Sequence, residues 1–471
     1  MPRTKAGQTG LVALFRLFKT AVTGSEKEFT TGSINRAIFL LAVPMILEML
    51  MESLFAVVDI YFVSHLGVEA VTAVGLTESI LNVVYTVAMG LGVAATAIIA
   101  RRIGEKNQRE AARAAVQSLY IGLALAGVVT LTGLFFSKDL LLLMGASEQI
   151  VEYGDVYTKT LLNSSVVIIL LFSINGIFRG AGDAALAMKS LWLANGLNIV
   201  LCPILINGWG VIPAYGLKGA AIATFIGRGA GVVFQLYHLT KGHDLIRITK
   251  EDLALAGKVI VSILQMAAGA TGQMLIATAS WIFMVRIIAN FGPDAVAGYT
   301  IAIRVLIFTL LPAWGMANAA SALVGQNLGA GRPERAEASG WKTAFYNMIF
   351  LGIMAILFWI GAPLILSWFT DQEVVIAYGV QCLRYVSTGY LFYAYGMVMI
   401  QSFNGAGDTK TPLLINLVVS WLWQMPLSWF LAEVCKLGPQ GVFIGIAISE
   451  STSALVAILL FRRGTWKQVK I

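Results

Sequence analysis

The chain has 471 residues, of which 58% are hydrophobic and only 12% are charged. A soluble domain carries about 25% charged residues, so the composition excludes an ordinary soluble protein and indicates an integral membrane protein. The net charge of +8 would suit a nucleic-acid partner, but its distribution, described below, gives no reason for one. The three cysteines, Cys202, Cys382 and Cys435, show neither metal-binding spacing nor a disulfide framework.

Apolar stretches recur along the whole chain, and a bilayer core takes roughly 20 such residues per helix. The longest stretches exceed one straight crossing and must tilt, bend or extend into water. We therefore predict an all-α polytopic membrane protein with twelve transmembrane helices. In chain order the expected spans are 37–64, 70–98, 113–136, 152–178, 188–207, 217–240, 257–290, 294–324, 340–369, 375–400, 412–433 and 438–462.

Basic residues are divided unequally between the two sides of these spans. With the N-terminus inside, the two tails and the loops after even-numbered spans hold 25 of the 33 Lys and Arg. The opposite loops hold only Lys138, Lys218 and Lys436. This is the positive-inside pattern, which predicts a plasma (inner) membrane protein with both termini in the cytoplasm.

The sequence is an internal repeat. Residues 179–183, Arg-Gly-Ala-Gly-Asp, return as Asn-Gly-Ala-Gly-Asp at 404–408, 225 positions later. The glycine pairs at 67 and 292 and at 104 and 329 keep the same offset. Six spans per copy is an even number, so both copies enter the membrane from one side. Two six-helix lobes are expected, related by a pseudo-two-fold axis along the membrane normal.

The repeat also divides the chain. We expect a tail over 1–32 that could hold an interfacial helix, a first lobe over 33–242, a cytoplasmic linker over 243–252, a second lobe over 253–463 and a tail over 464–471. The two Gly-Ala-Gly-Asp segments are expected to be structural turns. Their glycines permit left-handed backbone, and Asp183 and Asp408 can cap the helix that follows.

The first span carries three acids, Glu48, Glu52 and Asp59, whose spacing places them on one helical face. A charge at mid-membrane costs a few kcal/mol or more, so it suggests function. The offset of 225 pairs these acids with Gln273, Ala277 and Met284. An acid in apolar surroundings near other acids can exchange a proton near physiological pH.

Other polar residues favour the same lobe. Asn175, Asn198 and Thr224 fall in spans four to six, whereas the counterparts of the two asparagines are Ile400 and Trp423. We therefore expect a polar interior in the first lobe and an apolar one in the second.

Each candidate also has a structural explanation. Glu48 or Glu52 could lie near the cytoplasmic end and face water, and Asp59 could be a buried acid paired with Arg228. Glu78 and Glu450 are further candidates, for which an interhelical bond is the favoured interpretation. Aromatic and methionine side chains could line a cavity for cationic aromatic solutes or simply pack in the core. The candidates are Trp281, Met284 and Tyr299, together with Trp314, Tyr393, Tyr395, Met274 and Met316.

The duplicated lobes, the paired turns and the segment from Pro44 to Asp59 resemble the multidrug and toxic compound extrusion (MATE) family, over roughly residues 33–463. The resemblance implies two lobes that form a V around a central cavity. It also implies export of drugs, dyes and metabolites in exchange for protons or sodium. The chain is most similar to the DinF-like and archaeal branch, whose coupling site lies in the first lobe.

That branch uses a first-span aspartate, asparagines of the fourth and fifth spans, a sixth-span threonine and a second aspartate. By resemblance the first four are Asp59, Asn175, Asn198 and Thr224. Cys202 stands where the second aspartate is expected. Sodium prefers charged oxygen ligands to a thiol, so protons are the favoured coupling ion, although Glu48 or Glu52 could compensate.

We therefore predict a secondary active exporter that exchanges protons, or less favourably sodium, for organic cationic or amphipathic solutes. It is expected to be a monomer that binds no nucleic acid, metal or cofactor. The alternative is a lipid or lipid-linked oligosaccharide flippase of the same superfamily; such proteins tend to have a strongly cationic cavity and often fourteen spans. A membrane enzyme is not expected, because no nucleophile–base pair is in register.

Overall fold

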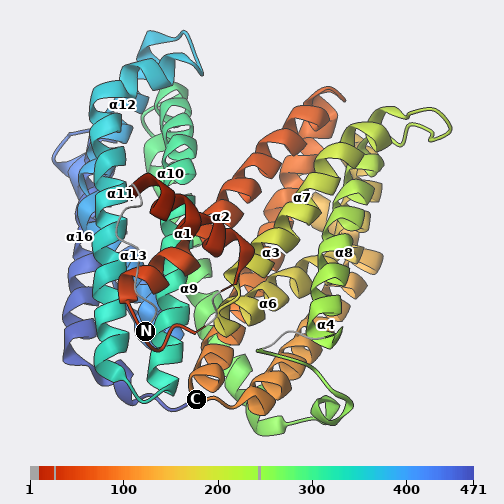
Figure 1. The fold of residues 1–471 in the computed structure, drawn as a ribbon. Helices are drawn as coiled ribbons and strands as arrows, with labels where there is room; N and C mark the ends of the chain where they lie inside the picture. Colours follow the sequence, from red (N-terminus) through yellow and green to blue (C-terminus); the bar gives the residue numbers. More distant parts are fainter. Residues whose placement is uncertain (1–9, 26–27, 242–244) are drawn as a thin grey trace.

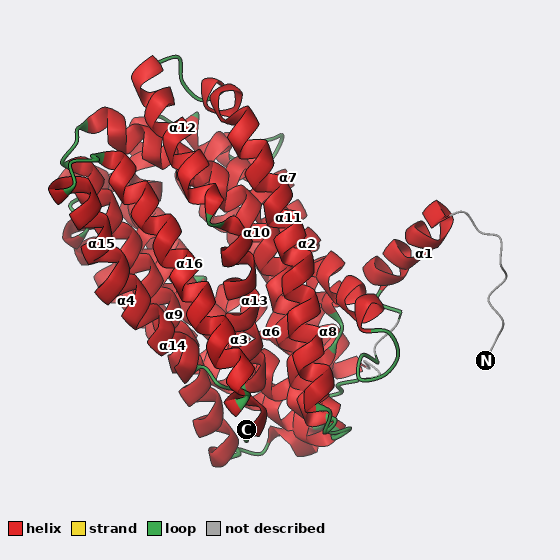
Figure 2. Cartoon of the chain, turned by 90° about the vertical axis from the view of Figure 1, so that its left-hand side faces the viewer, coloured by secondary structure: helices red, strands yellow, loops and turns green. Residues whose placement is uncertain are grey.

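The structure is a computed structural model that describes residues 10–25, 28–241 and 245–471. Apart from one isolated β-bridge between Trp209 and Ile212, the described residues form helices, turns and loops (Figures 1 and 2). The expected all-α class is therefore confirmed.

The first lobe follows a short helix, α1 (Gly10–Thr23), that exposes Leu14, Phe15 and Phe18. Its helices are α2 (Ile34–Ser64), α3 (Val68–Gly104), α4 (Gln108–Leu143), α5 (Glu148–Asn163), α6 (Ser165–Ala181), α7 (Ala184–Asn207) and α8 (Leu217–Lys241). α2 runs without interruption through Pro44.

A 3₁₀ turn, η1 (Lys250–Leu253), precedes the second lobe. Its helices are α9 (Gly257–Ala289), α10 (Pro293–Gly329), α11 (Pro333–Ser367), α12 (Glu373–Thr388), α13 (Tyr390–Ala406), α14 (Lys410–Asn416), the π-helix η2 (Leu417–Gln424), α15 (Met425–Trp429), the π-helix η3 (Phe430–Val434), α16 (Pro439–Arg463) and the 3₁₀ turn η4 (Thr465–Gln468).

Eleven helical stretches of the described chain are long and apolar enough to cross a membrane, with α5 and α6 forming one crossing over Glu148–Ala181. The one remaining expected span, the tenth (375–400), is the pair α12 and α13, which are separated only by Gly389 and are individually short. The same break falls at Ser164 in the first lobe, 225 residues earlier. Each predicted span therefore coincides with a helix or with a nearly continuous run of helices.

The two lobes diverge at one end and meet at the other (Figure 1). Across the junction α2 packs along α10, and α9 packs along α3. A Cβ added at Gly104 would overlap the Gln326 carbonyl, and one at Gly329 would overlap the Arg101 carbonyl. Adding 225 to Gly104 and Arg101 gives Gly329 and Gln326, so the repeat exchanges the two contacts. The pseudo-two-fold axis therefore passes between α3 and α10.

The repeated turns adopt one conformation in both lobes. Gly182 and Gly407 end their helices with φ of 90° and 87°, which is the left-handed region that glycine tolerates. Asp183 accepts from the backbone N–H of Leu186 at 3.0 Å, and Asp408 from that of Thr411 at 3.1 Å. The structural interpretation of these motifs is therefore right. The boundaries drawn at 242 and 253 stay a prediction, and residues 242–244 lie outside the described residues.

The offset changes near the end of each lobe. The loop between the last two long helices makes matching backbone hydrogen bonds in both lobes: Tyr215 to Leu205, Gly216 to Ile206, Leu437 to Leu431 and Gly438 to Ala432. The acceptors differ by 226 positions and the donors by 222. One additional residue has entered the eleventh span, which is wound partly as π-helix, and such winding accommodates single insertions. The expected pairing of Asn198 with Trp423 is therefore wrong, because Asn198 corresponds to Gln424.

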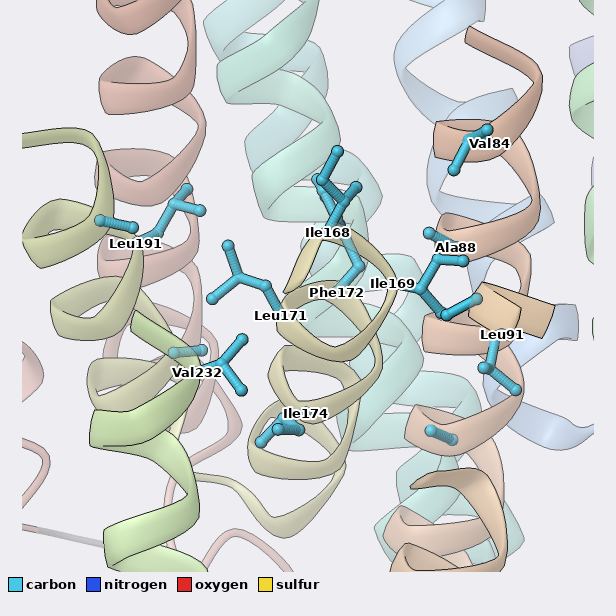
Figure 3. Close-up of a cluster of buried hydrophobic side chains, with 14 of the residues drawn as sticks. Val84, Ala88, Leu91, Ile168, Ile169, Leu171, Phe172, Ile174, Leu191 and Val232 are labelled. Atoms are coloured by element: carbon cyan, nitrogen blue, oxygen red, sulfur yellow. The ribbon is translucent and has the colours of Figure 1, made fainter. Parts of the chain in front are cut away.

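The core of the first lobe is built around α6. Its side chains Ile168, Leu171 and Ile174 are buried against α3 on one side and against α7 and α8 on the other (Figure 3). Because α6 is enclosed in this way, polar side chains on it must find partners inside the protein.

Both ends of the described chain fasten one lobe to the other. Before α2, the carbonyls of residues 29–32 accept hydrogen bonds from Arg332 and Arg335 of the second lobe. After α16, the carbonyls of Val469 and Ile471 accept from Arg101 and Arg102 of α3, at 2.6 and 2.9 Å. We call residues 29–32 and 469–471 the two straps.

Candidate functional site

Three adjoining cavities cross the molecule. The first-lobe cavity, of about 510 Å³, is lined by Glu52, Asp59, Glu78, Tyr85, Thr224 and Arg228 among others. The interlobe cavity, of about 100 Å³, shares Glu52, Met89 and Phe172 with it. The second-lobe cavity, of about 220 Å³, shares Val93, Met274, Trp314 and Gln401 with the interlobe cavity. The shared walls show that the three cavities adjoin one another from lobe to lobe.

Glu48 is fully buried at the interlobe cavity, so it does not face water as one interpretation allowed. Its carboxylate accepts hydrogen bonds from Arg179 Nε at 3.2 Å and Nη2 at 2.5 Å. It also accepts from Asn175 Nδ2 at 2.9 Å, and Asn175 Oδ1 accepts from Gln235 at 2.5 Å. A charge buried so deeply requires a bonded counter-charge, which Arg179 supplies. Asn175 is therefore a hydrogen-bond donor to Glu48 in this structure.

Glu52 lies one turn further along α2 and is bonded to Asn195 and to Arg228, both at 3.0 Å. The Arg228 side chain is 2% exposed, and its guanidinium lies 5.3–5.9 Å from the rings of Phe55, Tyr85 and Phe172. Cation–π contacts of this kind stabilise a partly desolvated arginine. Arg228 is therefore the partner of Glu52 and not of Asp59.

Asp59 lines the first-lobe cavity, and its carboxylate accepts few hydrogen bonds. In the described part of the chain its one side-chain hydrogen bond is from the Cys202 thiol, with Sγ 3.7 Å from Oδ1. A thiol is a weak donor, so the carboxylate keeps most of its capacity to accept a proton or an ion. Glu78 lines the same cavity.

Asn198 and Thr224 bond to each other, with Nδ2 donating to Oγ1 at 3.0 Å, and Thr224 lines the first-lobe cavity. Asp59 and Thr224 therefore line one cavity, with Cys202 hydrogen-bonded to Asp59 and Asn198 hydrogen-bonded to Thr224. Asn175 belongs to the neighbouring Glu48 group.

Sequence reasoning missed Arg179 and Asn195 as partners of the acids. For Arg179 a signal was present. The offset of 225 pairs Glu48 with Gln273 and Arg179 with Asn404, and the second pair is also bonded, Nε2 to Oδ1 at 3.1 Å. An acid and a base in the first lobe, Glu48 and Arg179, are thus both replaced by amides in the second. A paired replacement of this kind indicates that the two positions are in contact.

The second-lobe cavity corrects two expectations. Of the expected residues, Trp281, Trp314, Tyr393 and Met274 line it, but Met284, Tyr299, Tyr395 and Met316 do not. Met284 is 1% exposed in the core, and Tyr299, at 2%, stacks on Phe443 with ring centroids 6.1 Å apart. The expected apolar interior of this lobe is also wrong, because polar residues line the cavity: Gln273, Gln401, Asn404, Gln424 and Glu450.

Metal chemistry finds no support in the described side chains, among which no group of three or more His, Cys, Asp and Glu could hold a metal ion.

Comparison with known proteins connects these features to a family. The MatE family profile matches residues 44–204 and 270–430, one segment in each lobe. The chain is 25% identical to "Probable multidrug resistance protein YoeA" of Bacillus subtilis, over 93% of this chain and 96% of that protein. It is 26% identical to "Probable multidrug resistance protein NorM" of Thermotoga maritima, over 96% and 97%.

Solved structures agree. A crystal structure titled "MATE in the straight conformation" superposes with a TM-score of 0.87 at 29% identity, covering 92% of this chain and 97% of that one. A second, of a MOP superfamily transporter from Pyrococcus furiosus, gives a TM-score of 0.87 at 29% identity, covering 94% and 98%. The chain therefore belongs to the MatE family and is a multi-pass membrane transporter rather than an enzyme.

Proposed function

We propose that this protein is a proton-coupled exporter of organic solutes, cationic or amphipathic, in which Asp59 is the coupling acid. The observation that carries the proposal is the contrast among the three acids of α2. Glu48 and Glu52 are each bonded to an arginine, whereas the one side-chain hydrogen bond to Asp59 in the described chain comes from the Cys202 thiol. An acid that faces a cavity without a bonded cation can take up and release a proton without breaking an ion pair.

The mechanism follows from charge. A proton that enters the first-lobe cavity and binds Asp59 removes one negative charge from a wall shared by Glu52, Glu78 and Arg228. The balance between attraction to Arg228 and repulsion from the other acids then changes. Protonation of Asp59 then favours whichever conformation of the transporter is more stable with this charge removed, which is a shift of populations. Since Glu52 borders the interlobe cavity as well, such a shift reaches the space between the lobes.

The nature of the solute is supported by the relatives and by the cavity walls. Curated relatives over nearly the full chain are named as multidrug resistance or multidrug export proteins. The three cavities carry the acids Glu48, Glu52, Asp59, Glu78 and Glu450 against the bases Arg179 and Arg228. This excess of acids favours cationic solutes and disfavours the anionic headgroup that a lipid flippase would carry.

We further propose a monomer in the plasma (inner) membrane with both termini in the cytoplasm. The inequality of Lys and Arg between the two sets of loops supports this orientation. Protons are preferred to sodium because Cys202, 3.7 Å from Asp59, offers sulfur where a sodium site would want a second carboxylate.

The test is transport by the purified full chain in proteoliposomes, with ethidium as solute. A proton gradient alone should drive ethidium exchange, and a sodium gradient alone should not. Asp59→Asn should abolish the proton-driven exchange, whereas Glu152→Gln, an exposed acid of α5 remote from the cavities, should leave it intact. Exchange driven equally well by sodium without a pH gradient, or wild-type exchange by Asp59→Asn, would overturn the proposal.

A further inference from the structure

We propose that the second-lobe cavity is a binding site for aromatic organic cations in which Glu450 is the counter-charge. The inference rests on the proposed export function and names the solute site within it. It begins from the equivalence of α8 and α16. Both helices have 25 residues, and the matching loop hydrogen bonds before them fix their register at 222. In this register Glu450 occupies the position of Arg228.

The two lobes therefore carry opposite charges at one place in the scaffold. In the first lobe Arg228 is bonded to Glu52 of α2. In the second lobe the residue at the position of Glu52 is Ala277 of α9. The acid of the second lobe has thus lost the partner that the symmetric position would supply.

Glu450 has no replacement partner in the described chain. No hydrogen bond or ion pair to its carboxylate is found there, and it is the one charged side chain among the described residues that line the second-lobe cavity. It lies near the middle of α16 (Pro439–Arg463), where an unpaired charge in a membrane protein is costly. A residue that the fold does not need and does not neutralise is best explained by a ligand.

The polar neighbours of Glu450 are already engaged with one another. Gln273 bonds Asn404, whose Nδ2 also donates to Gln401 at 3.2 Å. Gln424 Oε1 accepts from Ser280 Oγ at 3.2 Å. Among the described lining residues, Glu450 is therefore the one full negative charge that a ligand could meet. A single free carboxylate suits a ligand with one delocalised or shielded positive charge.

The remainder of the wall suits an aromatic cation. Trp281, Trp314, Tyr390 and Tyr393 line the cavity, and aromatic faces attract organic cations in desolvated sites. Met274 and Met397 are also present; their flexible thioethers adapt to ligands of different shape. The site combines a fixed charge with an adaptable apolar wall.

The π-helix η2 gives this cavity a wall that the first lobe lacks. Its residues Val419, Ser420 and Gln424 line the cavity, whereas the corresponding helix of the first lobe, α7, is α-helical throughout. π-helical turns are rare and frequently lie at functional sites. The extra residue has therefore reshaped the wall of the cavity that Glu450 lines.

The cavity also adjoins the interlobe cavity, because Met274 and Trp314 line both. A cation held by Glu450 would therefore lie beside the space between the lobes.

The experiment measures binding of tetraphenylphosphonium, a permanently charged aromatic cation, to the purified full chain in detergent. Glu450→Gln should weaken this binding by about tenfold or more, the size expected for a desolvated cation that loses its counter-charge. Neutral triphenylphosphine oxide should bind both proteins alike. Binding of tetraphenylphosphonium to Glu450→Gln with wild-type affinity would overturn the site.

A second measurement uses the unaltered protein and therefore does not depend on the folding of the variant. Dicyclohexylcarbodiimide, which modifies acids in apolar surroundings, is applied and the modified residues are identified by mass spectrometry. Tetraphenylphosphonium should protect Glu450, and triphenylphosphine oxide should not. Equal modification of Glu450 with and without the cation would contradict the proposal.

Asp59→Asn separates this inference from the coupling proposal. It should retain tetraphenylphosphonium binding while losing proton-driven exchange. Wild-type exchange by Asp59→Asn with loss of binding in Glu450→Gln would refute the coupling role and leave the cation site standing.

Discussion

Glu48 on α2 and Arg179 on α6 form a buried ion pair, and the residues at the same places in the second lobe, Gln273 and Asn404, form an amide hydrogen bond. The fold of a lobe thus requires a polar bond between these two helices but does not require charge. The ion pair belongs to the chemistry of the first lobe, and its two halves are stable only together.

Arg179→Met should therefore destabilise the protein by about 3–5 kcal/mol, because it leaves the Glu48 carboxylate buried and unpaired. The double variant Glu48→Gln with Arg179→Asn, which reproduces the pair of the second lobe, should recover most of that stability. Unfolding in detergent, followed by tryptophan fluorescence, would measure both. A double variant as unstable as Arg179→Met would show that the two lobes do not tolerate the same pair.

The contact between α3 and α10 gives a prediction about packing. Gly104→Ala and Gly329→Ala each force a Cβ into a backbone carbonyl of the other helix, where no flexible side chain can yield. Each should cost about 1–3 kcal/mol, as overpacking usually does. The control is Gly196→Ala in α7, whose added Cβ would meet nothing within 4 Å; it should be neutral or slightly stabilising. Stability of all three variants at the wild-type level would argue against close apposition of the helices.

Cys202→Asp should change the ion that the protein uses. It would place a second carboxylate beside Asp59, which lines the same cavity as Thr224, and sodium binds where several oxygens with net negative charge converge. Sodium-driven ethidium exchange in proteoliposomes should appear. Cys202→Asn supplies an oxygen without the charge and should remain proton-driven. The expectation fails if neither variant responds to sodium.

The proposed orientation can be checked with a native cysteine. Cys435 is exposed in the loop that carries Lys436, whereas Cys202 and Cys382 are buried. A membrane-impermeant maleimide should label Cys435 in intact cells, and Cys435→Ser should abolish this labelling. In that background a cysteine at exposed Arg247 should react only after permeabilisation. The reverse pattern would invert the topology.

The repeat could be read from the sequence because glycines mark it. Gly182 and Gly407 need left-handed backbone, and Gly104 and Gly329 lie against another helix, so no other residue fits and the spacing stays visible. The number of spans and the lobe symmetry followed from this, together with the apolar runs.

The register at the end of the second lobe could not be obtained in the same way. The extra residue of the eleventh span raises the offset between the lobes to 226, and the shorter loop before α16 then lowers it to 222. Neither change can be detected by a search for residues at a constant spacing of 225. For this reason Asn198 was matched to Trp423 instead of Gln424, and the relation between Arg228 and Glu450 was missed.

The placement of cavity residues failed for a different reason. In a soluble helix, polar residues identify the outer face, but a membrane helix is apolar on all sides. Trp281 and Met284 lie three positions apart on α9, and nothing in their neighbourhood indicates that Trp281 borders a cavity while Met284 is buried in the core. Asp59 was recognisable because an acid is conspicuous in an apolar span.

The two straps have a consequence for following transport as it happens. Each crosses from its own lobe to the other, and each is held through backbone carbonyls by arginines. Separation of the lobes at this end must therefore release residues 29–32 and 469–471 together. The rate of protease cleavage at these segments would then report how often the lobes separate where the straps join them. This rate should rise under conditions that favour the separated state. Loss of the arginine side chain at Arg101 or Arg335 should speed this cleavage, because it removes hydrogen bonds that hold these segments in place.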